Sequence, residues 1–302
     1  MRYHAGTVKE FGPDEMAQWT DPWEHIRLLS DEGRNGALAG FLRRHAKGQR
    51  LLEVGCGLGI WSCFAAKLGA DQVYAVEQST TAELARELVA RNGLEARVEV
   101  IEGDIHEVEP RSVDIAFMEL QNADPFVEGV LGATEAARAW LDGRRGRVAP
   151  RRMRVLAAAA EVKEGIEEAQ RAQADLRRLT GPSGLDLGPL EHLWRPDWPY
   201  RFIGSQAELR GPAVEVLDLD LTADVELPES ITVALPCEAP ISAVVVWFEA
   251  ELDDDAMFSN PPSQPGHWGL LQSGFAHPVD PQDGRVEISI TLDDEELVLR
   301  PA

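Results

Sequence analysis

The pattern of hydrophobic and polar positions changes near Pro150 and divides the chain into two parts. In the first part, short apolar runs typical of buried strands alternate with stretches whose apolar residues recur at helical spacing. The predicted strands are 51–54, 73–77, 98–101 and 113–118, and the predicted helices are 60–68, 81–91 and 124–140. The last helix is expected to begin at an Asp124 N-cap followed by Pro125. Such alternation predicts a parallel sheet with right-handed crossovers, a Rossmann-like α/β fold.

The second part is rich in short strands and contains one helical stretch. The predicted strands are 153–161, 214–221, 231–234, 241–251 and 286–292, and the stretch with helical character is 164–179. Strand 241–251 is expected to lie in the middle of a sheet because it carries a run of β-branched and aromatic residues. This part predicts an antiparallel barrel or sandwich. We therefore expect N-terminal helices over 1–49, an α/β domain over 50–150 and a β domain over 151–302, interrupted at about 164–199.

A glycine-rich turn follows the first predicted strand. The segment 51–59 reads Leu-Leu-Glu-Val-Gly-Cys-Gly-Leu-Gly, so Gly55, Gly57 and Gly59 can let backbone approach a ligand closely. Glu77 ends the next strand about twenty residues on, where such folds use an acid to bind ribose hydroxyls. Position 60 is Ile60 instead of the third glycine of the dinucleotide pattern, which argues against NAD. The G-x-G-x-G spacing resembles that of S-adenosylmethionine (SAM) methyltransferases, and an ordinary βαβ turn is the alternative.

Several other polar residues are expected at the same edge of the sheet. Ligands of such sheets bind beyond the carboxyl ends of the strands. The segments 53–59 and 104–106, together with Glu77 and Glu119, all fall at strand ends of this kind. Their convergence predicts one binding site.

Composition restricts the class of protein further. The formal net charge is −23, which argues against nucleic acid as a partner because phosphate binding needs a basic surface. The charge favours either a solvated acidic surface or attraction of a cationic substrate. The sequence contains no apolar run of membrane-spanning length and no apolar signal segment. Its three cysteines fit neither a disulfide framework nor a metal site. We expect a cytoplasmic enzyme without a metal, and we expect the acidic run 253–255 to be a solvated loop.

Taken together, the order of these features resembles the protein arginine methyltransferase family. Residues 29–35 resemble the family's helix over the cofactor, with Asp31 and Arg34 three apart. The turn 55–59 with Glu77 matches the cofactor loop and ribose acid. Glu119 and Glu128, nine residues apart, match the spacing of the family's two active-site glutamates. Residues 266–268, Gly-His-Trp, resemble its Thr-His-Trp loop in the β-barrel.

The resemblance implies roles for individual residues. It implies SAM as cofactor and S-adenosylhomocysteine as product, an arginine-like or other cationic acceptor, and a head-to-tail homodimer formed through the arm tip near 180–190. It implies that Arg34 holds the SAM carboxylate and that His267 pairs with Asp31. The implied catalytic residues are Glu119, Glu128, His267 and Asp31. The implied acceptor-binding residues are Glu119, Glu128 and Trp268. The implied cofactor residues are Arg34, Gly55, Cys56, Gly57, Gly59, Glu77, Asp104, Ile105 and His106.

One segment departs from the family. Between its two glutamates the family places Trp-Met-Gly-Tyr, whereas residues 120–123 here are Leu-Gln-Asn-Ala. The family's methionine after the second glutamate is Val130 here. The chain thus resembles a divergent, bacterial-type member.

The chemistry of the proposed reaction explains why two carboxylates are needed. SAM carries a sulfonium and a guanidinium keeps its proton in proteins, so two cations must meet. Two acids neutralise them and grip the planar guanidinium. The prediction is therefore N-methylation of a guanidinium of a small molecule or a particular peptide. A non-catalytic SAM-binding scaffold and a methyltransferase for an uncharged metabolite remain alternatives, since Glu119 could simply end a strand and Glu128 could simply favour a helix dipole.

Overall fold

The computed structural model describes residues 22–143, 146–162, 200–293 and 296–302, with the single positions 171, 174 and 178. The predicted arm at 164–199 therefore lies almost wholly outside the described residues. Within the described part of the chain, no helix has the length and apolar character needed to cross a membrane.

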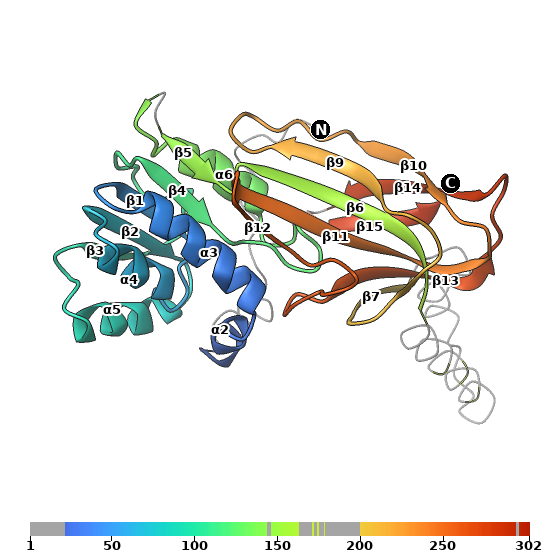
Figure 1. Cartoon of the computed structure of the whole chain (residues 1–302), viewed down its shortest axis with the longest axis horizontal. Helices are drawn as coiled ribbons and strands as arrows, with labels where there is room; N and C mark the ends of the chain where they lie inside the picture. Colours follow the sequence, from blue (N-terminus) through green and yellow to red (C-terminus); the bar gives the residue numbers. More distant parts are fainter. Residues whose placement is uncertain are drawn as a thin grey trace. The chain divides into compact units, whose positions relative to one another are not determined.

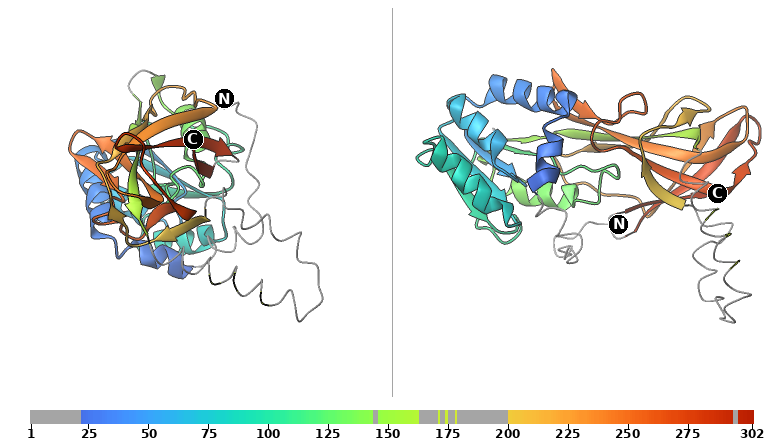
Figure 2. Two further views of the ribbon diagram at one scale, coloured as in Figure 1. Left: turned by 90° about the vertical axis from the view of Figure 1, so that its right-hand side faces the viewer. Right: turned by 90° about the horizontal axis from the view of Figure 1, so that it is seen from below.

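Five parallel strands form the first sheet, in the order β3-β2-β1-β4-β5 (Figures 1 and 2). Their bounds are Arg50–Val54 (β1), Gln72–Glu77 (β2), Val98–Glu102 (β3), Ile115–Met118 (β4) and Arg147–Ala149 (β5). The helices around them are Pro22–Leu28 (α2), Glu32–His45 (α3), Ile60–Lys67 (α4), Thr81–Arg91 (α5) and Val130–Arg138 (α6). The predicted parallel α/β sheet is confirmed.

The two faces of this sheet bury different side chains because strand residues alternate in direction. Leu52 and Val54 of β1 belong to a core cluster that includes Ala133 and Ala137 of α6. Glu53, between them, faces the other side and accepts a hydrogen bond from Ser62 of α4. Helices α4 and α6 therefore cover opposite faces of the sheet.

The predicted start of the helix after β4 is wrong. The structure begins α6 at Val130, six residues later than the Asp124 N-cap. Asp124 instead closes a local turn, in which its Oδ1 accepts the Phe126 N–H at 3.2 Å. Gly129 then adopts a left-handed conformation at φ 70° and becomes the N-cap. An Asp-Pro pair favours both a helix start and a turn, so local sequence alone does not separate the two.

The remaining strands form two antiparallel sheets. One has the order β10-β14-β15, and the other has the order β7-β13-β11-β6-β8, with β12 paired to β11 and β9 paired to β6. The bounds are Arg152–Glu161 (β6), Tyr200–Gly204 (β7), Glu208–Leu209 (β8), Val214–Asp220 (β9), Ser230–Pro236 (β10), Ile241–Asp253 (β11), Ala256–Ser259 (β12), Leu270–Val279 (β13), Arg285–Asp293 (β14) and Glu296–Pro301 (β15). Strand β11 lies between β13 and β6, as predicted for 241–251. The antiparallel β part that the sequence predicts is confirmed, whereas β7, β8, β12, β13 and β15 were not predicted.

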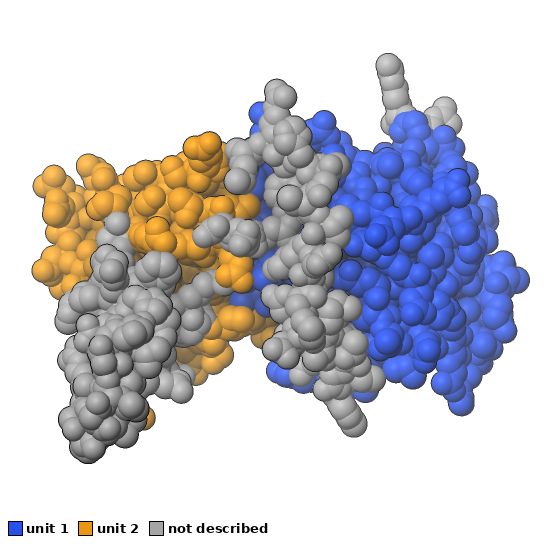
Figure 3. Space-filling view, turned by 180° about the vertical axis from the view of Figure 1, so that it is seen from behind, with its two compact units in different colours: residues 1–153, 218–227, 249–259 blue, residues 154–217, 228–248, 260–302 orange. Residues whose placement is uncertain are grey.

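The chain folds as two compact units (Figure 3). Unit 1 covers residues 1–153, 218–227 and 249–259, and unit 2 covers 154–217, 228–248 and 260–302. The chain thus returns to unit 1 twice after residue 153. The predicted domain limits at 49 and 150 stay predictions.

Candidate active site

The turn after β1 is held by its backbone. The N–H groups of Gly55 and Cys56 both donate to the Val76 carbonyl, at 2.9 and 3.0 Å. Gly57 and Gly59 have φ of 52° and 71°, a region in which residues with a Cβ are strained. Burial raises the pKa of the Cys56 thiol well above its ordinary value, so the thiol stays protonated. The loop therefore contributes backbone, not a reactive sulfur.

Glu77 is fixed beside this loop at the end of β2. Its Oε2 accepts the Gly57 N–H at 2.7 Å and its Oε1 accepts the Ser79 N–H at 2.8 Å. Each carboxylate oxygen has a second lone pair, so Glu77 keeps acceptor capacity for ribose hydroxyls. His25 of α2 lies on the other side of the loop, since a Cβ added to Gly57 would stand 2.6 Å from its Nδ1. His25 was not among the predicted site residues, because its proximity to residue 57 arises only from the tertiary structure.

The start of α3 carries Arg34 into the site. Asp31 is the N-cap of α3, and its Oδ1 accepts the Arg34 N–H at 2.9 Å. The Arg34 side chain is buried, and its Nε donates to Glu119 Oε2 at 2.6 Å. Its Nη2 also contacts this oxygen. The predicted holder of the SAM carboxylate thus pairs with the first predicted catalytic acid, 85 residues further along the chain.

Glu128, the second predicted acid, lies in the turn before α6 and not inside a helix. Its Oε1 accepts a hydrogen bond from Asn122 Nδ2 at 3.0 Å. Burial raises the pKa of Glu128 to about 8, and the negative charge of Glu119 adds to the rise. Asn122 and the positive charge of Arg34 act in the opposite direction. Glu128 directly precedes the Gly129 N-cap, so its charge also lies near the positive N-terminal end of α6.

Gln121, between the two glutamates, is also buried. The residue is only 2% exposed, and neither atom of its side-chain amide has a hydrogen-bond partner among the described residues. Buried polar groups are normally paired, so this amide is a local source of instability in the active-site loop.

A third acid, Glu53, begins the predicted strand-end segment 53–59, but the sequence assigned it no role of its own. It is buried on β1 and accepts a hydrogen bond from Ser62 Oγ. Burial raises the pKa of Glu53 to about 8, Ser62 opposes the rise, and the charges of Arg34 and Glu77 act on it in opposite directions. A charged residue inside an apolar strand is the sequence signal that could have identified it.

The predicted adenine-side residues follow β3. Asp104 Oδ1 accepts the His106 N–H at 2.9 Å and lies 2.7 Å from His106 Nδ1. Ile105 is buried in the core cluster that also contains Met118. The structure therefore presents two polar side chains anchored by one apolar residue, and their contact with adenine stays a prediction.

His267 and Trp268 belong to unit 2. Trp268 is buried, and its ring packs edge-on against Phe248 with centroids 5.2 Å apart. The His267 ring lies beside it at 4.1 Å between centroids. Asn260 Nδ2 donates to the Gly269 carbonyl at 2.8 Å and fixes the loop. The pairing of His267 with Asp31 of unit 1, and the contact of Trp268 with an acceptor, stay predictions.

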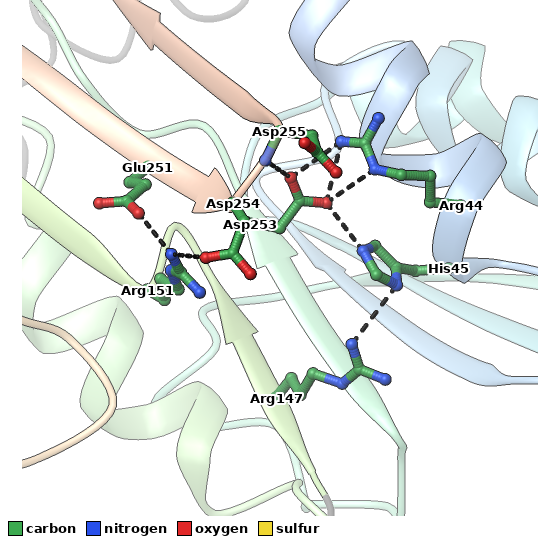
Figure 4. Close-up of polar contacts among 8 residues, drawn as sticks. All are labelled: Arg44, His45, Arg147, Arg151, Glu251, Asp253, Asp254 and Asp255. Atoms are coloured by element: carbon green, nitrogen blue, oxygen red, sulfur yellow. Dashed lines mark hydrogen bonds and ion pairs between the residues drawn. The ribbon is translucent and has the colours of Figure 1, made fainter.

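The far end of α3 is held by the β11–β12 hairpin (Figure 4). Asp253 accepts hydrogen bonds from Arg44 Nε at 3.0 Å and from His45 Nε2 at 2.8 Å. Arg147 Nη1 lies 3.4 Å from His45 Nδ1, and since arginine only donates, the His45 proton belongs on Nε2. The expectation of a solvated loop at 253–255 is thus wrong for Asp253.

These contacts also affect the ionisation of Asp253. Burial alone raises the pKa of Asp253, but the Asp255 N–H, Arg44 and His45 together bring it below its ordinary value. Asp253 is therefore an ionised anchor for the helix whose other end carries Arg34.

The donor set near the glycine loop fits SAM. The site combines a glycine loop with positive φ angles, a strand-end acid with spare acceptor capacity and a buried arginine. These groups match a nucleoside, its ribose and an amino-acid carboxylate. Gly57, Glu77 and Arg34 are the residues that would hold these three parts.

Comparison with known proteins agrees with this chemistry. A family model described as a methyltransferase domain matches residues 51–136. An arginine N(omega)-methyltransferase of Streptomyces achromogenes subsp. streptozoticus is 27% identical over 272 residues, covering 84% of this chain and 71% of that protein. Among solved structures, Arabidopsis thaliana protein arginine methyltransferase 10 superimposes with a TM-score of 0.80 at 22% identity, over 91% of this chain and 89% of that one. The Trypanosoma brucei PRMT1 enzyme-prozyme heterotetrameric complex with AdoHcy gives a TM-score of 0.75 at 23% identity, with the same shares covered.

Proposed function

Because this chain belongs to the SAM-dependent protein arginine methyltransferase family, we propose that it methylates a nitrogen of an arginine-like guanidinium. The observation that carries the proposal is the pair Glu119 and Glu128. One acid is held by Arg34 and the other by Asn122, in a loop that directly follows β4 of the SAM-binding sheet.

The two acids suit a reaction between cations. When bound, SAM supplies the methyl group on a positively charged sulfonium. A guanidinium brought to it is repelled unless carboxylates stand close by. At 4 Å and an effective dielectric constant of about 20, each opposite-charge pair is worth about 4 kcal/mol before desolvation. Arg34 offsets part of the Glu119 charge, so an ionised Glu128 is needed to bind the acceptor.

The reaction also releases a proton from the methylated nitrogen. Glu128 can take this proton because burial and Glu119 raise its pKa to about 8. An acid with a pKa near the working pH exchanges protons efficiently in both directions. Glu128 thus has two roles, as an anion that binds the acceptor and as the base that receives the proton.

The acceptor proposed here is a small guanidinium compound or a particular arginine peptide. The support is the loop 120–123, where this chain has Leu-Gln-Asn-Ala. Leu120 packs on the glycine loop, since a Cβ added to Gly55 would stand 2.6 Å from its Cδ2. The similarity to the Streptomyces relative, an arginine N(omega)-methyltransferase, also supports an arginine nitrogen as acceptor.

The proposal is tested by turnover with a panel of acceptors. The panel contains free arginine, arginine peptides, other cationic amines and uncharged metabolites, each with saturating SAM. Changing Glu119 or Glu128 to glutamine keeps side-chain size and removes one charge. Each change should lower turnover by roughly 30- to 1,000-fold, equivalent to 2–4 kcal/mol for a desolvated charge partner.

SAM affinity is the control for these variants. Calorimetry should show that Glu128→Gln binds SAM with a dissociation constant close to that of the wild type, because the charge removed interacts with the acceptor and not with SAM. If both variants keep more than about a third of wild-type turnover, the paired-glutamate mechanism is wrong. Tight SAM binding without turnover on any acceptor would favour a non-catalytic scaffold.

We further propose that the chain forms a homodimer. Helices α4 and α5 present apolar side chains at the surface of unit 1, among them Trp61, Phe64 and Leu84, the last 40% exposed. The occupant proposed for this face is the leucine-rich segment 180–190 of a second copy, which lies outside the described residues. Light scattering should give a dimer that becomes a monomer on deleting residues 181–189 or on changing Leu84 to glutamate. A wild-type monomer at micromolar concentration would contradict the proposal.

A further inference from the structure

Asn122 stands in the active-site loop and contacts Glu128 directly. Its Oδ1 accepts the Ala123 N–H at 2.7 Å, and its Nδ2 lies 3.0 Å from Glu128 Oε1. A backbone N–H can only donate, so the carbonyl oxygen of the amide must face Ala123. The NH₂ group must then face Glu128, and the orientation of this amide is fixed by its two partners.

This hydrogen bond has two consequences for Glu128. First, it fixes the rotamer of the carboxylate, because one of its two oxygens is held from a loop that is itself closed by local hydrogen bonds. The other oxygen, Oε2, has no hydrogen-bond partner among the described residues. Second, a donor favours the charged form of an acid, against burial and against Glu119.

We propose that Asn122 is a positioning residue that acts through Glu128, presenting Oε2 to the cationic acceptor and favouring the ionised form of the carboxylate. This inference rests on the proposed function, since it assigns a role within the same site. The segment 120–123 is where the chain departs from the family it resembles, so the contact is a property of this sequence.

Other charges act on Glu128 as well. Glu119 favours its protonated form and Arg34 favours its ionised form. Both remain in place when Asn122 is changed, and Arg34 stays paired with Glu119. A change of Asn122 therefore isolates the contribution of one neutral donor.

The test is the pH dependence of turnover in Asn122 variants. The acceptor is an arginine derivative blocked at its amino and carboxyl groups, so that the acceptor itself does not titrate between pH 6 and 9.5. Asn122→Ala should move the midpoint of kcat/KM upward by about half to one pH unit, which lowers activity at pH 7 by roughly 3- to 10-fold. Activity should recover toward the wild-type value at pH 9.5, and SAM affinity should not change. Asn122→Asp replaces the donor with a third acid and should move the midpoint further upward.

Two controls separate this role from a purely structural one. In the Glu128→Gln background, Asn122→Ala should have almost no further effect on turnover, because a residue that acts through Glu128 has nothing left to influence. Asn92→Ala, an exposed asparagine at the end of α5, should leave the pH profile unchanged.

A carbon NMR titration of glutamate carboxyls gives the same midpoint without turnover, with Glu128 assigned from the Glu128→Gln spectrum. Equal Glu128 midpoints in wild type and Asn122→Ala would overturn the inference, even if the wild type is active. A wild type that methylates no guanidinium compound would overturn the proposed function instead, while a shifted NMR midpoint would still support the contact between Asn122 and Glu128.

Discussion

The ionisation of Glu128 should make acceptor turnover strongly dependent on pH. Burial and the Glu119 charge raise the pKa of this acid to about 8, so it is mostly neutral at pH 7 and mostly ionised above pH 8. The guanidinium binds the ionised form. For an acid whose pKa is raised, the active form is therefore lost as the pH falls below 8, and kcat/KM should decline with it.

The size of the effect follows from the ionised fraction. With a pKa of about 8, roughly 1% of Glu128 is ionised at pH 6, about 10% at pH 7 and about 90% at pH 9. The value of kcat/KM should rise close to tenfold between pH 6 and 7 and about fivefold between pH 7 and 8, and then level off, about 90-fold between pH 6 and 9. An acid with an ordinary pKa would already be ionised at pH 6 and would give an almost flat profile.

The assay is the initial rate with saturating SAM and acceptor well below KM, at constant ionic strength. Glu53 is a second acid whose pKa lies near 8, so Glu53→Gln serves as the matched control. That variant should keep the slope, whereas Glu128→Gln should lose it along with most of the activity. A flat wild-type profile between pH 6 and 8 would refute the reasoning, as would a slope that disappears in Glu53→Gln and persists in Glu128→Gln.

Three further predictions concern binding and stability. Glu77→Ala removes the acceptor of two backbone N–H groups, and calorimetry should show SAM binding weakened at least tenfold; an unchanged dissociation constant would remove Glu77 from the site. Asp253→Ala should lower the free energy of unfolding by about 2–3 kcal/mol, measured by thermal or urea unfolding, because the Asp253 side chain anchors α3. Asp254→Ala is the control: the Asp254 carboxylate is exposed, so this change should alter the free energy of unfolding by less than about 0.5 kcal/mol. Equal effects of the two changes would contradict the role of Asp253 as an anchor. Gln121→Met should stabilise the protein by about 1–2 kcal/mol by removing a buried amide that has no partner among the described residues. A lower melting temperature would show that the amide is satisfied by water.

Part of the fold could be predicted because its signals are local. Strands β1 and β2, the helix between them and the turn 55–59 follow from short apolar runs, from helical spacing and from glycines where φ must be positive. The start of α6 could not be predicted, because Asp124-Pro125 fits a helix start as well as a turn. Strands such as β13 were missed, because a strand gains its stability from its neighbours more than from its own residues.

The sequence by itself determined the parallel sheet, the glycine loop, the acid at Glu77 and the spacing of the two glutamates. Only the tertiary structure decided which residues meet: Arg34 with Glu119, His25 with Gly57, and Asp253 with the end of α3. The ionisation of Glu128 also depends on tertiary structure, because burial and the charges around it arise only when distant segments pack together. Local periodicity and backbone conformation are encoded over a few residues, whereas desolvation and charge pairing depend on packing between segments far apart in the chain.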